Sequence, residues 1–409
     1  MSSKSARAAH VRTPRATQKP ERKWPEMKTL LMFLLLMLVP SPPAQQQEQR
    51  FTPVEGASLT ARQEAARSRA SAAGHARYWT AYAFDVRPGV AVDFEYVSDD
   101  GRITINNGTF VTGDWDGTRF EPAVETRNLG VFVLRESDGR VSRVEVYNLA
   151  RRRDYAGYPV FWLGRAPAEE SLQFLRDLAE SGQTNEVAVA AVRALALHDD
   201  RRVPEALERV ARTSRAEPVR AQAVRSLGTP PASPQTRDFL ASLARDAREP
   251  AEVRRAAVSA LGRARDAQAL ALLTSLYESF AERELRRTVM SWIARNENRA
   301  AAVNFLVKVV GDDSDKEMRR RALAQLGEIA GERALGTLTE TAERRDADTE
   351  LQRQALQAIG RRPAAESVPL LIKYAQTHAK PEIRKQALVL LGRSGDPAAF
   401  EFLRAFLTR

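Results

Sequence analysis

One phrase of the sequence recurs along the second half of the chain. It reads EVRRAAVSALG at Glu252–Gly262, EMRRRALAQLG at Glu317–Gly327 and EIRKQALVLLG at Glu382–Gly392. Aligned on the small-apolar pair of this phrase, seven copies follow one another at spacings of 32, 34, 32, 33, 33 and 32 residues. They begin at Ala191, Ala223, Ala257, Val289, Ala322, Ala355 and Ala387. Such a regular period predicts a solenoid, in which each unit packs on its neighbours.

Each unit contains two helical patterns. The first is apolar at helical spacing, as in SLQFLRDLA (Ser171–Ala179), and the second is the recurring phrase. Short turns follow the phrase, as in GRARD after Leu261 and GRSGD after Leu391. We expect the glycine after each leucine to be a helix C-cap with a positive φ angle.

These units resemble short HEAT-like repeats, the subclass that also occurs in bilin lyases. The stretches EVRRAAVSALGRARD and LGRSGDPAAFEFL carry the resemblance, which covers residues 167–409. It implies an all-α solenoid of seven helix pairs plus a terminal helix. It does not imply one activity, because HEAT-like arrays include scaffolds, enzymes and glycosylases.

Residues 77–164 follow a different pattern, in which short β-branched and aromatic runs alternate with turn residues. About seven such runs predict a small antiparallel all-β module, either a sandwich or a barrel. Asn107-Gly108 predicts a hairpin turn, and SDDG (98–101) and ESDG (136–139) mark further turns. We expect the tryptophans of this module to fill its core rather than to form a binding surface: Trp79, Trp115 and Trp162. The fold class is therefore multidomain, a β module followed by an α-solenoid.

The N-terminal region predicts export. After Met27, the cation Lys28 precedes an apolar run from Leu30 to Val39, and the small residue Ala44 follows two prolines. A helix of ten residues rises only about 15 Å, half of a bilayer core, so this run is too short to span a membrane. We interpret 27–44 as a signal peptide and expect a periplasmic or secreted protein that contacts the membrane only through this segment.

The flanking segments have no helical or strand period. Residues 1–26 are interpreted as a disordered extension, or as an untranslated one if Met27 is the true start. Residues 45–76 are interpreted as a linker that could include a helix from Ser58.

The net charge of +11 is concentrated at the N-terminus, where residues 1–44 carry eight Lys or Arg and two Asp or Glu. The remaining surplus of five positive charges over 365 residues argues against a nucleic-acid partner. The chain has no Cys, and its four His share no metal-ligand spacing. No phosphate loop or nucleophile motif is present, so we expect no cofactor, no metal and no catalytic site. The acidic stretches 311–317 and 344–350 are interpreted as solvated turns with helix-capping Asp.

The second helix of each unit can be numbered from its first apolar residue, which is Ile383 in the last copy. Position +1 lies close to the apolar face, and position +2 lies well away from it. We expect the arginines at +1 to bury their stems and tie neighbouring units together: Arg220, Arg254, Arg286, Arg319 and Arg384. Position +2 forms a basic ladder, and two further arginines stand at +6 in the first copies. These candidate partner-binding residues are Arg193, Arg225, Arg255, Arg287, Arg320, Arg353 and Lys385.

The ladder has two interpretations. It could line a groove for an acidic partner, or each cation could pair with the Glu three residues before it, which stabilises the helix by a few tenths of a kcal/mol. Trp292 at +7 is a further candidate, because it breaks the repeat pattern. It is either a packing plug or an anchor for the partner.

Together these features predict an exported, non-enzymatic scaffold that binds a protein with an acidic surface. The alternatives are a lyase-type or other enzyme built on HEAT-like repeats, and a binder of anionic envelope polymers.

Overall fold

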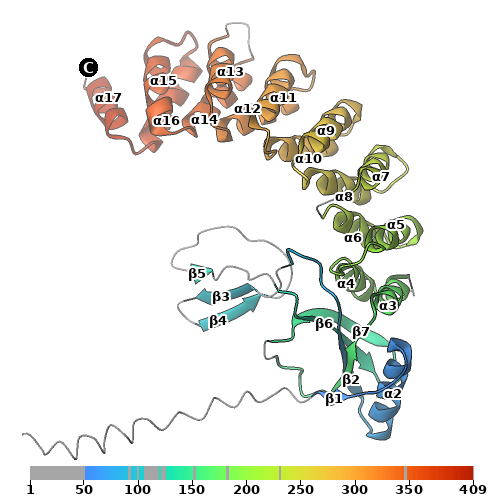
Figure 1. Cartoon of the computed structure of the whole chain (residues 1–409). Helices are drawn as coiled ribbons and strands as arrows, with labels where there is room; N and C mark the ends of the chain where they lie inside the picture. Colours follow the sequence, from blue (N-terminus) through green and yellow to red (C-terminus); the bar gives the residue numbers. More distant parts are fainter. Residues whose placement is uncertain are drawn as a thin grey trace, which may run out of the picture. The chain divides into compact units, whose positions relative to one another are not determined.

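The computed structural model describes residues 51–408 except 91–93, 99–100, 106–118, 121–125, 151–152, 181–183, 230–231 and 345–347. Phe51–Arg409 forms one compact unit, in which a five-stranded sheet precedes a row of paired helices (Figure 1). Several predictions lie outside the described residues: the extension 1–26, the signal peptide 27–44, the Asn107-Gly108 turn and the core position of Trp115.

The five-stranded sheet has the order β1-β8-β2-β6-β7 and is mixed. Its strands are β1 (Thr52–Pro53), β2 (Arg77–Ala83), β6 (Leu129–Glu136), β7 (Val141–Asn148) and β8 (Val160–Arg165). β2 pairs with β6, and β6 with β7, in antiparallel fashion, but β8 runs parallel to both β1 and β2. The expected purely antiparallel arrangement is therefore wrong for this sheet. After β7 the chain crosses back over the sheet, and β8 adds to the edge of β2 that β6 leaves free. Because of this crossover, β8 runs parallel to β2.

The other described strands form a separate three-stranded sheet of order β4-β3-β5. They are β3 (Phe94–Ser98), β4 (Gly101–Ile105) and β5 (Arg119–Phe120), all paired antiparallel. The predicted ESDG turn fits this topology, because it joins β6 to β7. The predicted SDDG turn includes residues 99–100, which lie outside the described residues. Gly139 in ESDG has a φ of 85°, and its N–H donates to the Glu136 carbonyl at 2.8 Å.

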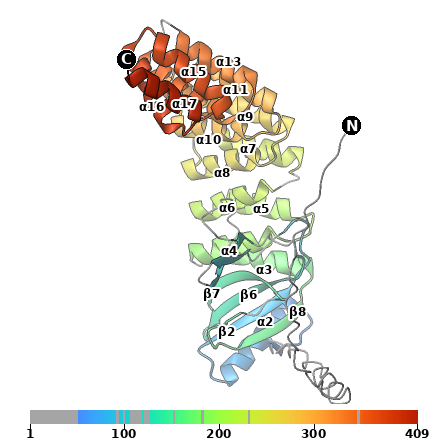
Figure 2. The same cartoon turned by 90° about the vertical axis from the view of Figure 1, so that its left-hand side faces the viewer.

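Helices cover one face of the five-stranded sheet. Alternate strand residues such as Tyr78 and Tyr82 point to this face and are fully buried. Helix α2 (Leu59–Ala72) packs there through buried Leu59, Ala66 and Ala70 (Figure 2). The segment interpreted as a linker contains this helix directly after Ser58, whose hydroxyl accepts from the Ala61 N–H at 3.1 Å. It belongs to the packed unit and is not a free linker.

Aromatic side chains cluster on the opposite face of the sheet. Trp79 is 4% exposed there and packs edge-on against Phe132. The ring of Phe51 stacks on Trp162, with centroids 5.8 Å apart, at the half-buried edge of the cluster. The expectation that tryptophans fill the core is confirmed for Trp79, and Trp162 packs against the same core.

In the part of the chain that the structure describes, the solenoid consists of seven helix pairs and a terminal helix, as predicted. The first helices of the pairs are α3 (Ala168–Glu180), α5 (Val203–Thr213), α7 (Pro234–Arg245), α9 (Ala267–Ser279), α11 (Arg299–Asp312), α13 (Glu332–Glu343) and α15 (Ala364–Thr377). The second helices are α4 (Asn185–Leu195), α6 (Glu217–Leu227), α8 (Ala251–Gly262), α10 (Arg283–Ala294), α12 (Lys316–Glu328), α14 (Thr349–Gly360) and α16 (Pro381–Arg393). The terminal helix is α17 (Pro397–Leu407).

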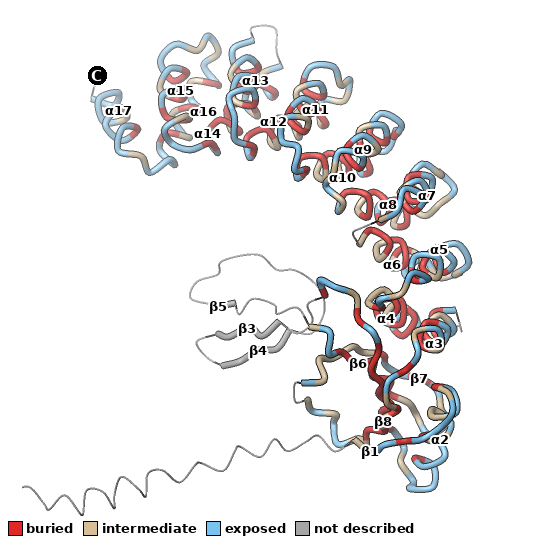
Figure 3. Tube along the Cα trace, viewed as in Figure 1, coloured by how far each residue is buried: buried red, intermediate tan, exposed pale blue. Residues whose placement is uncertain are grey.

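First and second helices form two layers, and the buried residues lie where the layers meet (Figure 3). Each second helix contacts the second helices before and after it. The second helices therefore form one continuous layer (Figure 1). One hydrophobic core runs from the helix-covered face of the sheet through all the units, because α4 packs directly on β7.

The glycine that follows the repeat leucine does not have the expected conformation. Gly262 and Gly392 lie inside α8 and α16, and neither has a positive φ angle. The left-handed residue comes three positions later, at Gly395 with a φ of 67° and at Arg265 with a φ of 54°. Gly262 is required for another reason: a Cβ atom there would overlap the ring of Trp292 on the next second helix.

Candidate partner-binding surface

The predicted ladder residues lie on the layer of second helices, on the side away from the hydrophobic core. Arg255 is exposed on α8, Arg353 on α14 and Lys385 on α16, while Arg287 and Arg320 are partly exposed. This placement follows from the helical period, since position +2 is turned away from the buried positions zero, +4, +5 and +8.

Most of the ladder is neutralised within its own helices. The predicted pairs with the Glu three residues earlier are present in four units: Arg255 with Glu252, Arg287 with Glu284 (2.7 Å), Arg320 with Glu317 (2.7 Å), and Arg353 with Glu350 (3.4 Å). In the fifth unit, Lys385 and Glu382 form no ion pair among those of the described residues. For Arg287, Arg320 and Arg353, the pairing interpretation is the one that the geometry supports.

The two arginines at +6 are placed differently. Arg225 on α6 reaches across to the next unit and pairs with Glu252 on α8 at 2.7 Å. Because Arg255 pairs with the same carboxylate, two guanidinium groups share one negative charge. Arg193 on α4 has a long contact of 3.5 Å from its Nε to the Gln222 amide oxygen.

A fourth arginine joins this group, and the sequence interpretation missed it. Arg263 at the end of α8 extends over α6 and donates to the backbone carbonyl of Arg225. Burial and the neighbouring Arg225 charge both lower the pKa of Arg263, and the same causes in the same order lower the pKa of Arg193. The sequence did indicate this residue. Arg263 stands at position +10 of its unit, and positions +2, +6 and +10 follow one another at a spacing of four residues along one side of the helix.

The arginines at +1 bind the ends of helices, and three of the five fasten neighbouring units to one another, as predicted. Their Nε atoms donate to carbonyls in the last turn of the first helix of the same unit: Arg220 to Ala211 (2.8 Å), Arg254 to Ala244 (3.0 Å) and Arg319 to Val310 (2.8 Å). Their terminal nitrogens reach the loop of the next unit: Arg220 to Glu249 (2.5 Å), Arg254 to Glu282 (2.5 Å) and Arg286 to Asp313. Arg220 and Arg254 therefore each satisfy an unpaired helix carbonyl and also bridge two units.

Trp292 is a packing residue. Its side chain is half-buried against the hydrophobic core and lies directly on Gly262 of α8. The guanidinium carbon of Arg295 stands 5.7 Å from the centroid of its ring. The plug interpretation of Trp292 is thus the one that these contacts support.

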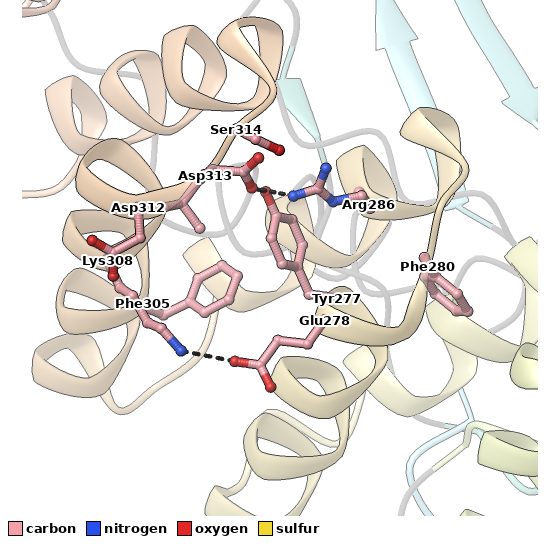
Figure 4. Close-up of a pocket in the computed structure, with 10 residues that line it drawn as sticks. Tyr277, Glu278, Phe280, Arg286, Phe305, Lys308, Asp312, Asp313 and Ser314 are labelled. Carbon is pink, nitrogen blue, oxygen red and sulfur yellow. Dashed lines mark hydrogen bonds and ion pairs between the residues drawn. The ribbon is translucent and has the colours of Figure 1, made fainter.

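A pocket of about 370 Å³ lies between the α9–α10 and α11–α12 units (Figure 4). In it the Tyr277 hydroxyl donates to Asp313 at 2.7 Å, and Asp313 also pairs with Arg286. Lys308 pairs with Glu278 at 2.8 Å across the pocket mouth. These contacts neutralise both cations of the pocket and join neighbouring units, so we interpret the pocket as part of the unit-to-unit packing.

The acidic turns act as predicted where the structure describes them. Asp315 caps α12 by accepting from the Glu317 N–H at 2.9 Å, and Asp348 caps α14 through the Glu350 N–H at the same distance. Within the described ranges, no three His, Asp or Glu side chains gather as they would around a metal ion. No helix in the part of the chain described is both long and apolar enough to cross a membrane.

Comparison with known proteins agrees with this architecture. Residues 211–291 and 337–409 match the family model of HEAT repeats, so the chain carries HEAT repeats in these two regions. No curated protein matches the chain.

Similar solved structures include human deoxyhypusine hydroxylase in complex with glycerol (19% identity, 58% of this chain and 90% of that chain, TM-score 0.30). Two others are yeast importin-beta, Kap95p (14% identity, 56% and 37%, TM-score 0.35), and Kap121p bound to Pho4p (17% identity, 55% and 33%, TM-score 0.36). The chain thus spans about a third of these two larger proteins. At such TM-scores the likenesses carry no argument about function.

Proposed function

We propose that this chain is an exported, non-enzymatic scaffold that binds another protein through the layer of second helices in its HEAT repeats. The observation that carries the proposal is a second-helix layer with a cation at +2 in five successive units, from Arg255 to Lys385, and with more arginines than paired carboxylates at its α4–α8 end. Exposed ion pairs contribute little to stability, so the fold alone gives weak reason for a cation at each of these positions. A surface that meets an acidic partner gives a stronger one.

The chemistry of the surface favours binding over catalysis. Apart from Lys385, its cations are guanidinium ions, which stay protonated in proteins and so serve poorly as general acids or bases. They are instead suited to forming paired hydrogen bonds with carboxylates.

The export part of the proposal rests on the pattern from Lys28 to Ala44. This pattern supports a location in the periplasm or outside the cell. N-terminal sequencing of natively produced protein should find a mature start near Gln45. A protein that begins at Met1 or Ser2 in the cytosolic fraction would contradict export.

Site-specific photo-crosslinking tests the binding surface. A benzoylphenylalanine at Ser259, which is partly exposed on α8 in the second-helix layer, should give a discrete adduct with one envelope protein. The same probe at Asn304, exposed on α11 in the other layer, is the control and should give none. Equal labelling from both positions, or no adduct from either, would refute the proposal.

A further inference from the structure

We propose that the partner docks an extended acidic peptide segment on four arginines of α4, α6 and α8: Arg193, Arg225, Arg255 and Arg263. We call these four residues the arginine cluster. This inference rests on the proposed function. It assigns the contact with the partner to one end of the ladder, whereas the sequence suggested a groove along the whole ladder.

The arginine cluster is the part of the second-helix layer where positive charge is not balanced. Among the described residues, Glu252 is the one carboxylate that forms an ion pair with any of the four, and it pairs with Arg225 and Arg255. Arg193 contacts the Gln222 amide oxygen instead, and Arg263 donates to the backbone carbonyl of Arg225. Farther along the layer, from α10 to α14, four other arginines each pair with a carboxylate of their own. There Arg287, Arg320, Arg353 and Arg361 pair with Glu284, Glu317, Glu350 and Glu328.

The arginines of the cluster repel one another electrostatically, so a negative charge placed among them would be stabilised. Burial and the Arg225 charge disfavour the charged forms of Arg193 and Arg263, and both nonetheless remain protonated because an arginine pKa is so high. Both side chains are exposed on the surface, so a carboxylate can reach them, and its charge would relieve the repulsion from Arg225. The self-paired arginines of α12 and α14 offer no such gain.

The size of the arginine cluster fits a short extended peptide. Neighbouring helices pack about 8–10 Å apart, so three adjacent second helices span roughly 20 Å. An extended chain covers that length with about six residues at roughly 3.3 Å each. Glu252 lies within the cluster, so a polymer with a negative charge on every unit would meet local repulsion. A peptide can place its acidic residues beside the arginines and leave a neutral one opposite Glu252.

Fluorescence anisotropy on the full chain tests the assignment. The probe is a fluorescein-labelled peptide of about six residues rich in glutamate. The paired variant Arg193→Gln/Arg225→Gln should weaken its binding by about tenfold or more and make the remaining affinity less sensitive to salt. The matched control Arg320→Gln/Arg353→Gln removes the same charge from self-paired positions and should weaken binding less than about twofold. Circular dichroism would verify that both variants are folded.

Three results would overturn the inference. Equal losses in the two variants would show that only net charge matters. Tighter binding of inorganic polyphosphate or single-stranded DNA than of the peptide would assign the arginine cluster to another polyanion. If the peptide does not bind the unaltered chain, the arginine cluster is not a site for an acidic peptide.

The crosslink from Ser259 separates failure of this inference from failure of the proposed function. If the inference is right, the adduct weakens in Arg193→Gln/Arg225→Gln and persists in the control variant. If the adduct persists in both, the partner binds the layer but not through the arginine cluster. If the unaltered chain gives no adduct, the proposed function itself fails.

Discussion

His198 is buried where the sheet meets the solenoid, and its hydrogen bonds define its protonation state. Its Nδ1 lies 3.0 Å from the Ala194 carbonyl and therefore carries a proton. Its Nε2 then accepts from the Ser171 hydroxyl at 2.7 Å, and Ser171 lies 3.0 Å from the Tyr82 hydroxyl on β2. The ring also stacks on Phe84, with centroids 4.2 Å apart. The fold thus holds a neutral histidine in a chain of satisfied polar groups.

This arrangement predicts a loss of stability in mild acid. Burial lowers the pKa of His198 from 6.5 to about 4, although the backbone carbonyls, Asp200 and Asp85 oppose the shift. The unfolded chain binds the proton more readily, so this contribution is complete above pH 6.5 and is lost as the pH falls towards 4. The loss is about 3 kcal/mol, from about 1.4 kcal/mol per pKa unit.

Urea unfolding between these pH values measures the effect. The variant His198→Gln should be less stable at neutral pH, yet its free energy of unfolding should fall less steeply in acid than that of the unaltered chain. Parallel pH profiles would show that His198 does not titrate on unfolding.

Arg265 carries backbone strain that a single substitution can remove. Its φ of 54° is left-handed, and the equivalent residue of the last complete unit is Gly395. Since this conformation costs a non-glycine residue about 1 kcal/mol, Arg265→Gly should raise the free energy of unfolding by roughly 0.5–1 kcal/mol. Arg361→Gly, at a C-cap with a φ of −87°, is the control and should lower it slightly. Thermal and urea unfolding would decide the signs.

At the scale of helices, close packing between second helices explains why the repeat phrase ends in glycine. Gly228 lies against Ala260, Gly262 against Trp292 and Gly327 against Ala358, each on the following second helix. A missing Cβ atom lets adjacent second helices approach closely. The larger Trp292 therefore occupies a site that Gly262 leaves open.

Glycine-to-alanine substitutions should have opposite effects at two helical sites. Gly262→Ala should destabilise the chain by about 1–3 kcal/mol, because the new methyl group overlaps the Trp292 ring. Gly336→Ala in α13 has no atom within 4 Å of the new Cβ and should stabilise by roughly 0.5–1 kcal/mol. Combining Gly262→Ala with Trp292→Ala should cost less than the sum of the two changes, as a double-mutant cycle would show. Additive losses would mean that the two residues do not compete for this space.

The sequence predicted the features that follow from position within one helix and missed several that depend on the packing of one element on another. Helical periodicity located the seven pairs and placed Arg254 near the core and Arg320 outside it, since both follow from position within a helix. The conformation of Gly262 was predicted wrongly, because its neighbour Trp292 is 30 residues away in the next unit. The contact of Arg263 with α6 and the parallel entry of β8 were missed for the same reason.

At the scale of the whole unit, the sheet closes the first end of the solenoid. Helix α4 packs on β7, as a preceding unit would pack on a later one. The apolar residues of this contact belong to the core that continues through the repeats, with Val141 and Val144 on the sheet and Val187 and Ala191 on α4. Because each unit contacts only its neighbours, the sheet should stabilise α3 and α4 far more than the later units.

A fragment of residues 167–409 tests this division. It keeps every contact between helix pairs, so circular dichroism should show a helical fold. Hydrogen exchange should become faster in α3 and α4, which lose the sheet, and remain nearly unchanged from α8 to α16.

A second fragment, 201–409, also lacks α3 and α4, and its fast exchange should move to α5 and α6. A uniform loss of protection in either fragment, or a spectrum without helix, would show that the units fold only with the sheet. A loss that moves with the cut is expected if each helix pair is held by its nearest neighbours.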